Sequence, residues 1–380
     1  MTKRHIPFNK SYIAGRELYH VAQAVSNGDI KGGGPFTQRC SDWFVETMRT
    51  KACLLTPSCT AALELSALLL DIREGDEVIL PSFTFTSTAN AFALRGARLV
   101  FADISADTIN IDPQEIEKLI SEKTKAICVV HYAGVACDME KILSIAEQHK
   151  IPVVEDAAHA VMAKYHGKYL GTLGDLGTFS FHETKNYSSG EGGALLINQS
   201  KYFERAEILR EKGTNRSKFF RGEVDKYGWM DVGSSFLPSE IVSAYLYGQL
   251  ERAEEINQMR KKIWNQYYER LRPLADSGYL TLPTVPDGCE HNGHLFYVLF
   301  GDLETRESIR QSMLPEGCSV VFHYLPLHSS PMGKRLGNDQ VLPVTDSISD
   351  RLLRFPLFCG LSENDVNYIC DVLERCVRAL

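Results

Sequence analysis

Short apolar runs rich in β-branched residues alternate with helical segments between residues 51 and 200, and this alternation constrains the fold more than any other feature. Continuous apolar strands that alternate with helices are typical of a parallel sheet covered by helices on both faces. The sequence therefore predicts an α/β fold with a seven-stranded, mostly parallel sheet flanked by helices. The candidate strands are 52–55, 77–80, 98–101, 126–130, 152–154, 177–181 and 194–197.

The length of 380 residues allows a large core and a second domain. We expect a large domain over residues 1–245, which begins with an N-terminal arm, and a smaller C-terminal α/β domain over residues 246–380. A long helical pattern from about Ser239 to Arg270 is expected to bridge the two domains.

Several local patterns add detail to this outline. Asp112, followed by a proline and then a glutamate, predicts a capped helix start, and Ser362 predicts the start of the last helix. The C-terminal domain is expected to contain strands at 295–300 and 319–322. The polar, Gly-interrupted segment 211–236 is too irregular for a regular element and is expected to form an ordered lid or binding loop.

Composition and charge exclude several classes of function. The net charge of −7 and the lack of a Lys/Arg-rich run argue against nucleic-acid binding. No run approaches the roughly 18 apolar residues that span a bilayer, and the start lacks the apolar segment of a signal peptide, so we expect a cytoplasmic protein with no membrane partner. The ten cysteines are scattered without a CxxC pair, which predicts reduced, mostly buried thiols and no structural metal.

A lysine stands between two of the predicted buried strands. The first strand pattern ends at Ser180, Lys185 follows five positions later in a polar, Gly-rich turn, and the next strand begins at Ala194. A lysine that loses solvation there has a lowered pKa and a nucleophilic amine, which is the requirement for holding an aldehyde cofactor as a Schiff base. From this segment alone, a solvated loop lysine is the alternative.

Other polar segments also directly follow predicted strands, where ligands of open parallel sheets bind. Ser58 and Thr60 open a helix and could hold a phosphate, or serve as ordinary helix caps. Asp156 could cap the next helix, or pair with a buried cation such as a protonated pyridine nitrogen. Phe83 or Phe85 could stack on a flat heterocycle, or belong to the core.

A glycine-rich turn at 31–34 could lie against a ligand or be a plain flexible turn.

Four of the features described above would together serve a single cofactor. They are the phosphate cradle, the carboxylate, the aromatic face and the lysine. Pyridoxal 5′-phosphate (PLP) requires all four of these groups. Their occurrence in this order after strands points to a PLP site.

The chain resembles fold-type-I PLP enzymes of the DegT/StrS family of sugar-nucleotide aminotransferases over essentially its whole length. The segment Phe-Ser-Phe-His-Glu-Thr-Lys-Asn around Lys185 is the most specific of the matching motifs. The other matching segments are 81–90, 130–134, 154–159, 190–193 and 323–328.

The resemblance implies a role for each matching residue. Lys185 would hold PLP covalently, Asp156 would keep the ring nitrogen protonated, and His159 would lie over the ring near its hydroxyl. Phe85, rather than Phe83, matches the stacking aromatic residue. The phosphate ligands would be Ser58, Cys59, Thr60 and Ser180.

Two positions depart from the family pattern. The family usually has glycine where Cys59 stands, which puts close backbone approach to the phosphate in doubt. An asparagine that often reaches that phosphate from the partner subunit is replaced by Leu237, and Ser234 or Ser235 could take its place.

Within the family, segments 56–61, 182–187, 210–217 and 219–222 are most similar to the enterobacterial-type dTDP-4-amino-4,6-dideoxygalactose transaminases of enterobacterial common antigen synthesis. This implies amination of dTDP-4-keto-6-deoxy-D-glucose by L-glutamate in a homodimer with shared active sites. Arg216, Arg221, His323 and His328 are candidate substrate contacts.

The main alternative is a related aminotransferase with another keto-sugar, amination at C3 or the other epimer. A sugar-deoxygenating branch carries histidine in place of the lysine, so Lys185 argues against it. A non-catalytic regulator of the same fold would lack the lysine or carry an added DNA-binding segment. An oxidoreductase is disfavoured because Gly171–Gly177 lacks the dinucleotide spacing.

Overall fold

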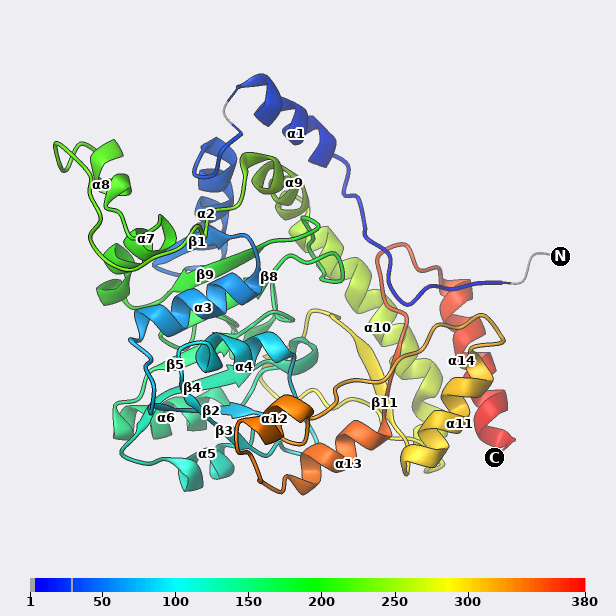
Figure 1. The fold of residues 1–380 in the computed structure, drawn as a ribbon. Helices are drawn as coiled ribbons and strands as arrows, with labels where there is room; N and C mark the ends of the chain where they lie inside the picture. The colour runs from blue at the N-terminus through cyan, green and yellow to red at the C-terminus, as the bar shows by residue number, and fades with distance from the viewer. Residues whose placement is uncertain (1–3, 29, 380) are drawn as a thin grey trace.

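The computed structural model describes residues 4–28 and 30–379; residues 1–3, 29 and 380 of the predicted domains lie outside the described residues. The predicted seven-stranded sheet forms, with the strand order β1-β9-β8-β5-β4-β2-β3 (Figure 1). The strand β9 is antiparallel to both of its neighbours and the other pairs are parallel, which confirms a mostly parallel sheet. The strands are β1 (Ala52–Thr56), β2 (Glu77–Pro81), β3 (Arg98–Ala102), β4 (Thr124–Val130), β5 (Val153–Asp156), β8 (Leu176–Ser180) and β9 (Gly193–Ile197).

Helices cover both faces of the sheet, and alternate residues of each strand enter different cores. Leu54 of β1 packs in a core with α3, α4 and α7, whereas its neighbour Leu55 packs on the opposite side with α2 and α9. In Figure 1, α3 and α4 lie in front of the strands. The bounds of these helices and of α5 and α6 are α2 (Pro35–Met48), α3 (Cys59–Leu69), α4 (Thr86–Ala93), α5 (Pro113–Leu119), α6 (Met139–His149), α7 (Phe203–Arg210) and α9 (Glu240–Leu250).

The sheet register brings the polar strand ends to one edge. Gly193, at the start of β9, pairs with Thr56 on one side and Ser180 on the other. Asp156, at the end of β5, pairs with Thr178, two residues before Ser180. Segments that lie more than 100 residues apart in the chain therefore meet at one edge, which prepares a binding site there.

A second apolar core lies in the C-terminal part of the chain, around the two-stranded sheet of β11 (Phe296–Leu299) and β12 (Leu352–Phe355). The predicted strand at 295–300 forms, and Ser362 caps the last helix. The predicted boundary between residues 245 and 246 falls inside α9 and stays a prediction. The helices of this part are α10 (Ala253–Asp276), α11 (Leu303–Met313), α12 (Pro331–Arg335), α13 (Pro343–Arg351) and α14 (Glu363–Arg378).

The structure corrects the predicted strand at 319–322. Here Val321 makes a single bridge, exchanging backbone hydrogen bonds with Arg354 of β12, and no continuous strand forms. The pairing stops because the chain then turns towards the sheet edge, where His323 meets Tyr132. The predicted long helix is also divided, since α9 ends at Leu250 and α10 begins at Ala253.

The polar segment 211–236 is more regular than predicted. It contains a short helix, α8 (Arg216–Phe220), and the ring of Phe219 packs 5.6 Å from that of Tyr227, so aromatic contacts support a helix that polarity alone disfavours. In Figure 1 this arm projects away from the sheet, next to α7.

The glycine-rich turn at 31–34 makes close contacts with the start of α9 and the residues before it. The buried carboxylate of Glu240 accepts hydrogen bonds from the backbone N–H groups of Gly34, Phe36 and Thr37, at the start of α2. A side chain at Gly32 would collide with the backbone of Pro238, so the turn needs a glycine for close approach.

The remaining described elements are α1 (Glu17–Ser26), the short 3-10 helices η1 (Tyr132–Gly134) and η2 (Ser200–Tyr202), and a small sheet of β6 (Lys164–Tyr165), β7 (Lys168–Tyr169) and β10 (Cys289–Glu290). Among the described residues, no helix has the length and apolar character needed to cross a membrane.

Candidate active site

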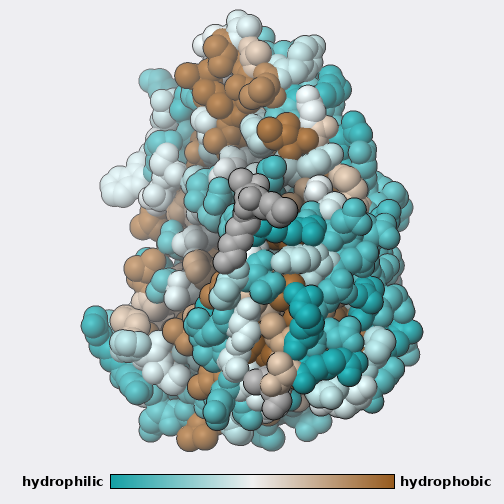
Figure 2. Space-filling model, turned by 90° about the vertical axis from the view of Figure 1, so that its right-hand side faces the viewer, coloured by the Kyte–Doolittle hydropathy of each residue, from teal (hydrophilic) through white to brown (hydrophobic). Residues whose placement is uncertain are grey.

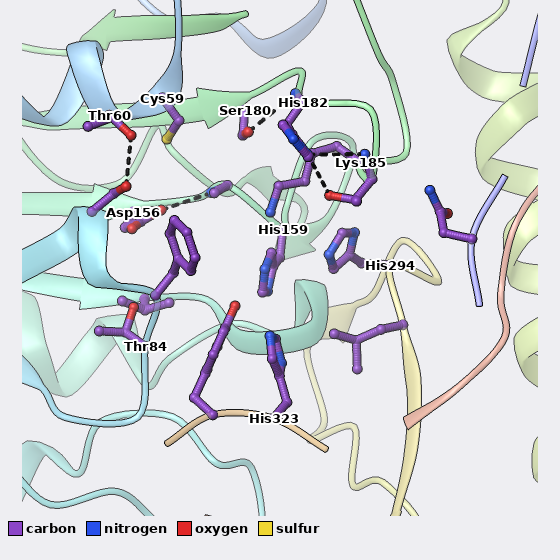
Figure 3. A pocket seen from close by; sticks show the side chains of 18 of the residues that line it. Cys59, Thr60, Thr84, Asp156, His159, Ser180, His182, Lys185, His294 and His323 are labelled. Atoms are coloured by element: carbon purple, nitrogen blue, oxygen red, sulfur yellow. Dashed lines mark hydrogen bonds between the residues drawn. The ribbon is translucent and has the colours of Figure 1, made fainter. Parts of the chain in front are cut away.

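A cavity of about 690 Å³ opens at the carboxyl edge of the sheet (Figure 3). Its walls come from the β1–α3 junction, the end of β5, the loop between β8 and β9, and the C-terminal part of the chain. The sequence-predicted residues that line it are Ser58, Cys59, Thr60, Phe85, Asp156, His159, Ser180, Lys185 and His323. The other three predicted site residues, Arg216, Arg221 and His328, do not line it.

Lys185 is carried by the tight loop that joins β8 to β9. Its backbone N–H donates to the carbonyl of His182, and the next side chain, Asn186, is buried. Burial lowers the pKa of the Lys185 amine to about 8, while the charge of Asp156 partly opposes this shift. An amine with this pKa is half neutral near pH 8, so it is far more nucleophilic than the solvated loop lysine of the alternative interpretation.

The N-terminus of α3 presents an anion site to the cavity. Ser58 caps the helix by accepting the N–H of Ala61, whereas the N–H groups of Cys59 and Thr60 belong to the first turn and have no carbonyl partner within the helix. Burial raises the pKa of the Cys59 thiol, so it stays neutral and adds no negative charge. These donors and the helix dipole fit a phosphate group.

Gly193 of β9 allows this helix start to lie directly against the sheet. A Cβ atom at Gly193 would lie 2.3 Å from the carbonyl carbon of Ser58 and 2.4 Å from the backbone nitrogen of Cys59. A glycine at position 193 therefore allows the start of α3 to pack directly against β9. The approach of the Cys59 backbone to a phosphate stays a prediction.

Asp156 ends β5 and points into the cavity (Figure 3). Its carboxylate accepts a hydrogen bond of 2.7 Å from the Thr88 hydroxyl and one of 3.2 Å from the N–H of Ala158. The chain continues as turns, so the helix-capping interpretation of Asp156 is wrong. Burial raises the pKa of this carboxyl group. The protonated ring nitrogen of PLP would supply a positive charge to pair with the carboxylate.

Three histidines form a row along another wall of the cavity (Figure 3). The ring of His159 stacks 4.2 Å from that of His294 and lies 6.3 Å from that of His323. Burial lowers the pKa of each, which keeps the rings neutral. The Nδ1 atom of His159 is buried without a hydrogen-bond partner and is available to an oxygen of the cofactor.

The two candidate stacking phenylalanines have different surroundings. Phe83 is only 1% exposed and packs in an apolar core, whereas Phe85 is 60% exposed and lines the cavity. Phe85 is therefore the one that can meet a ring bound in the cavity.

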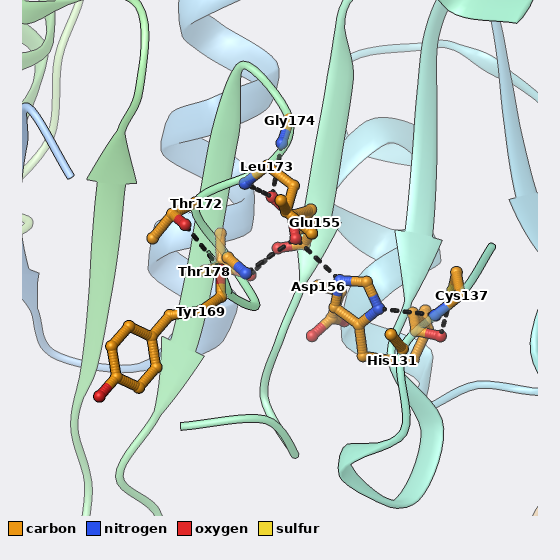
Figure 4. Close-up of polar contacts among 12 residues, drawn as sticks. His131, Cys137, Glu155, Asp156, Tyr169, Thr172, Leu173, Gly174 and Thr178 are labelled. Carbon is orange, nitrogen blue, oxygen red and sulfur yellow. Dashed lines mark hydrogen bonds and ion pairs between the residues drawn. The ribbon is translucent and has the colours of Figure 1, made fainter. Parts of the chain in front are cut away.

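Behind the cavity, a buried network fixes the end of β5 (Figure 4). The carboxylate of Glu155 accepts three backbone N–H groups, from Gly171, Leu173 and Gly174, and also contacts Nε2 of His131 at 2.8 Å. Nδ1 of His131 accepts a backbone N–H from Cys137, so the hydrogen-bond network assigns the ring proton to Nε2. This network anchors the residue next to Asp156.

Sequence reasoning missed two polar wall residues from the C-terminal part, His294 and Arg354, and it gave no role to Tyr324 although this residue lies in the matching segment 323–328. His294 and Arg354 are each separated from Lys185 by more than 100 residues, and no local motif marks them.

The three predicted residues outside the cavity make contacts with other residues of the protein. His328 is buried, and its Nδ1 lies 2.8 Å from the Ser82 hydroxyl. Arg216 lies 5.0 Å above the Phe220 ring, and Arg221 pairs with Glu207. Within the described residues, no cluster of His, Cys, Asp or Glu could hold a metal ion.

Comparison with known proteins decides the family. The family model for DegT/DnrJ/EryC1/StrS aminotransferases matches residues 11–374. This chain belongs to that family. It is 30% identical to the GDP-perosamine synthase of Escherichia coli O157:H7 over 373 residues, which cover 98% of each chain. It is also 32% identical to the spore coat polysaccharide biosynthesis protein SpsC of Bacillus subtilis over 385 aligned residues, which cover 98% of this chain and 97% of that one.

Solved structures agree with this assignment. One of them is a Streptococcus pneumoniae protein assigned as a sugar aminotransferase and solved in its pyridoxamine 5′-phosphate (PMP) form. It matches with a TM-score of 0.92 at 27% identity, and the match covers 99% of this chain and 100% of that one. The fold is that of a fold-type-I PLP-dependent enzyme. The cofactor is PLP, and the phosphate site at α3, the carboxylate of Asp156 and the amine of Lys185 fit its three main groups.

Proposed function

We propose that this sugar aminotransferase transfers the amino group of L-glutamate to C4 of dTDP-4-keto-6-deoxy-D-glucose, giving dTDP-4-amino-4,6-dideoxy-D-galactose and 2-oxoglutarate. One observation carries the proposal: Lys185, Asp156 and the N-terminus of α3 converge on one cavity. The choice of sugar rests on the similarity of residues 182–187 and 210–217 to the enterobacterial-type transaminases.

When bound, PLP supplies an aldehyde that carries the amino group between substrates and a ring that withdraws electrons from the reacting carbon. Nζ of Lys185 takes the proton from the α-carbon of glutamate in one half-reaction and delivers a proton to C4 of the sugar in the other. The carboxylate of Asp156 keeps the ring nitrogen protonated. The keto oxygen of the sugar leaves as water, and a second water supplies the keto oxygen of 2-oxoglutarate.

A GDP-linked keto-sugar is the second candidate, because one relative is named as a GDP-perosamine synthase. Amination at C3 and the opposite epimer at C4 are the remaining alternatives.

The test is incubation of the holoenzyme with ¹⁵N-labelled L-glutamate and a panel of dTDP- and GDP-linked 4-keto and 3-keto sugars. NMR of the products identifies the aminated carbon and its configuration. We expect ¹⁵N at C4, axial, in the dTDP-4-keto-6-deoxyglucose product. Amination of only a GDP-sugar, or only at C3, would contradict the proposed substrate and leave the aminotransferase assignment intact.

We also propose a homodimer with shared active sites. Apolar side chains gather on the surface over α1, at the top of Figure 2, where Leu18 is 73% exposed and Tyr19 and Val25 are also exposed. Trp229, in the 211–236 arm, is 81% exposed. Exposed apolar groups of this size favour association. Sedimentation equilibrium should give twice the 42.6 kDa chain mass; a monomer at micromolar concentration would refute this proposal.

A further inference from the structure

The ring of His159 is placed by packing rather than by hydrogen bonds. Its Nδ1 is buried without a partner, and within residues 4–28 and 30–379 no group is hydrogen-bonded to its other nitrogen either. The ring stacks on that of His294 at 4.2 Å, with the planes 23° apart, and meets the ring of Tyr132 edge to face at 5.9 Å (Figure 3). The ring of His323 lies farther away, at 6.3 Å. The direction of Nδ1 therefore depends most closely on the ring of His294.

The ring of His294, in contrast, is fixed by hydrogen bonds. Its Nδ1 lies 2.8 Å from Oδ1 of Asn186, whose Nδ2 donates to the carbonyl of Asn292. A carbonyl can only accept, so the amide of Asn186 has one possible orientation and Nδ1 of His294 is the donor. The backbone of His294 is also held, because its N–H donates to Oδ1 of Asn292 and its carbonyl accepts from Arg260.

Asn292 joins this arrangement to the backbone of His159. It is only 1% exposed, and its Nδ2 donates to the carbonyls of His159 and Val161 at 2.8 and 2.9 Å. Asn186 directly follows Lys185 in the chain. One buried network therefore links the lysine loop, the turn after β5 and the C-terminal part of the chain.

This network satisfies its own polar atoms but leaves Nδ1 of His159 without a partner. A buried polar atom without a hydrogen bond is costly, and an oxygen of the bound cofactor would remove that cost. Burial lowers the pKa of His159 and of His294, so both rings are neutral and stack without charge repulsion. The stack then decides whether Nδ1 of His159 points where the oxygen lies.

We propose that His294 is a positioning residue, whose ring, fixed by Asn186, stacks on the ring of His159 and directs Nδ1 of His159 towards an oxygen of the bound cofactor. Site residues of this kind need their own rotamers fixed by packing and by supporting hydrogen bonds. This assignment rests on the proposed function, in which PLP occupies the cavity.

Two substitutions separate the ring of His294 from its hydrogen bond. His294→Phe keeps a flat ring but cannot donate to Asn186, whereas His294→Asn keeps a donor near the Nδ1 position but has no ring. PMP binds without a covalent bond to the protein, so its dissociation constant from the apoenzyme and the visible band of the PLP holoenzyme are both measured. We expect His294→Asn to shift the band and to weaken PMP binding about 10-fold, the upper end of the effect of losing a stacked pair.

His294→Phe should keep the band and bind PMP within about 3-fold of the wild type, although it should unfold at a lower temperature because Oδ1 of Asn186 loses its donor. The control is His291→Asn. His291 packs on Trp264 at 4.3 Å outside the cavity, and asparagine can still accept the N–H of Gly293, so the band and PMP binding should not change.

A double-mutant cycle shows whether His294 acts through His159. In a His159→Ala background, His294→Asn should cause no further loss of PMP binding, because the ring that it positions is gone. Additive losses would show that His294 acts independently and would overturn the proposal. Equal losses in His294→Phe and His294→Asn would assign the effect to a ring nitrogen and overturn it too, as would no loss in either.

NMR of the wild-type protein with ¹⁵N-labelled histidine covers the case in which the variants fail to fold. In the apoenzyme, the ring of His294 should carry its proton on Nδ1, and adding PMP should change the ring signals of His159 while His294 keeps this tautomer. A proton on Nε2 of His294, or unchanged His159 signals, would refute the assignment. No measurement here uses a sugar or an amino donor, so if no nucleotide keto-sugar is aminated, only the proposed function fails.

Discussion

Lys185→Ala is expected to lose the visible absorbance band of the lysine-bound cofactor and to lower the transamination rate by a factor on the order of 10⁴ or more. In the proposed mechanism, this variant lacks both the amine that holds PLP and the base that moves the proton at the reacting carbons. Absorbance spectra of the purified protein and steady-state turnover with L-glutamate measure the two effects separately.

The matched control is Lys168→Ala. Lys168 is exposed in β7 and does not line the cavity, so this variant should keep both the spectrum and the turnover. A Lys185→Ala enzyme that turns over at the wild-type rate would remove Lys185 from the mechanism.

Asp156→Asn is expected to lower turnover by a factor on the order of 1000 while the protein remains folded. The substitution keeps the size of the side chain but removes the charge that would hold the ring nitrogen protonated. The hydroxyl of Thr88 can still donate to the remaining oxygen. Turnover and thermal unfolding are measured on the same preparations, because a structural role would change the unfolding temperature together with the rate.

Asp138→Asn is the control for this substitution. Asp138 caps α6 at the surface, and asparagine caps helices equally well, so turnover should not change. Turnover of Asp156→Asn within a few-fold of the wild type would contradict the assigned role of Asp156.

The sequence predicted those residues of the site that lie next to the ends of predicted strands. Ser58, Asp156 and Ser180 each stand at or just after the carboxyl end of an apolar strand, and parallel strands bring those ends together whatever the loops do. The same local reasoning wrongly predicted a strand at 319–322. This apolar run pairs with a neighbouring strand at one residue only. It also left a helix cap open as one interpretation of Asp156, because local sequence does not show that turns follow.

The rest of the site depends on packing between distant parts of the chain. Arg354 and His294 reach the cavity because β11 and β12 lie against the sheet edge, and neither carries a local signature. Gly193 is needed at its position because the start of α3 lies directly against it, a contact between segments more than 130 residues apart.

The sequence by itself determined the sheet, and it placed Lys185 and Asp156 beside strand ends of that sheet, because hydrophobic periodicity and strand-end residues are local properties. Only the tertiary structure decided which side chains close the cavity and which remain without a partner. That outcome depends on how the C-terminal elements pack against the sheet. Among the described residues they leave Nε of Arg354 without a hydrogen-bond acceptor, and they bury His328, a candidate substrate contact, against Ser82.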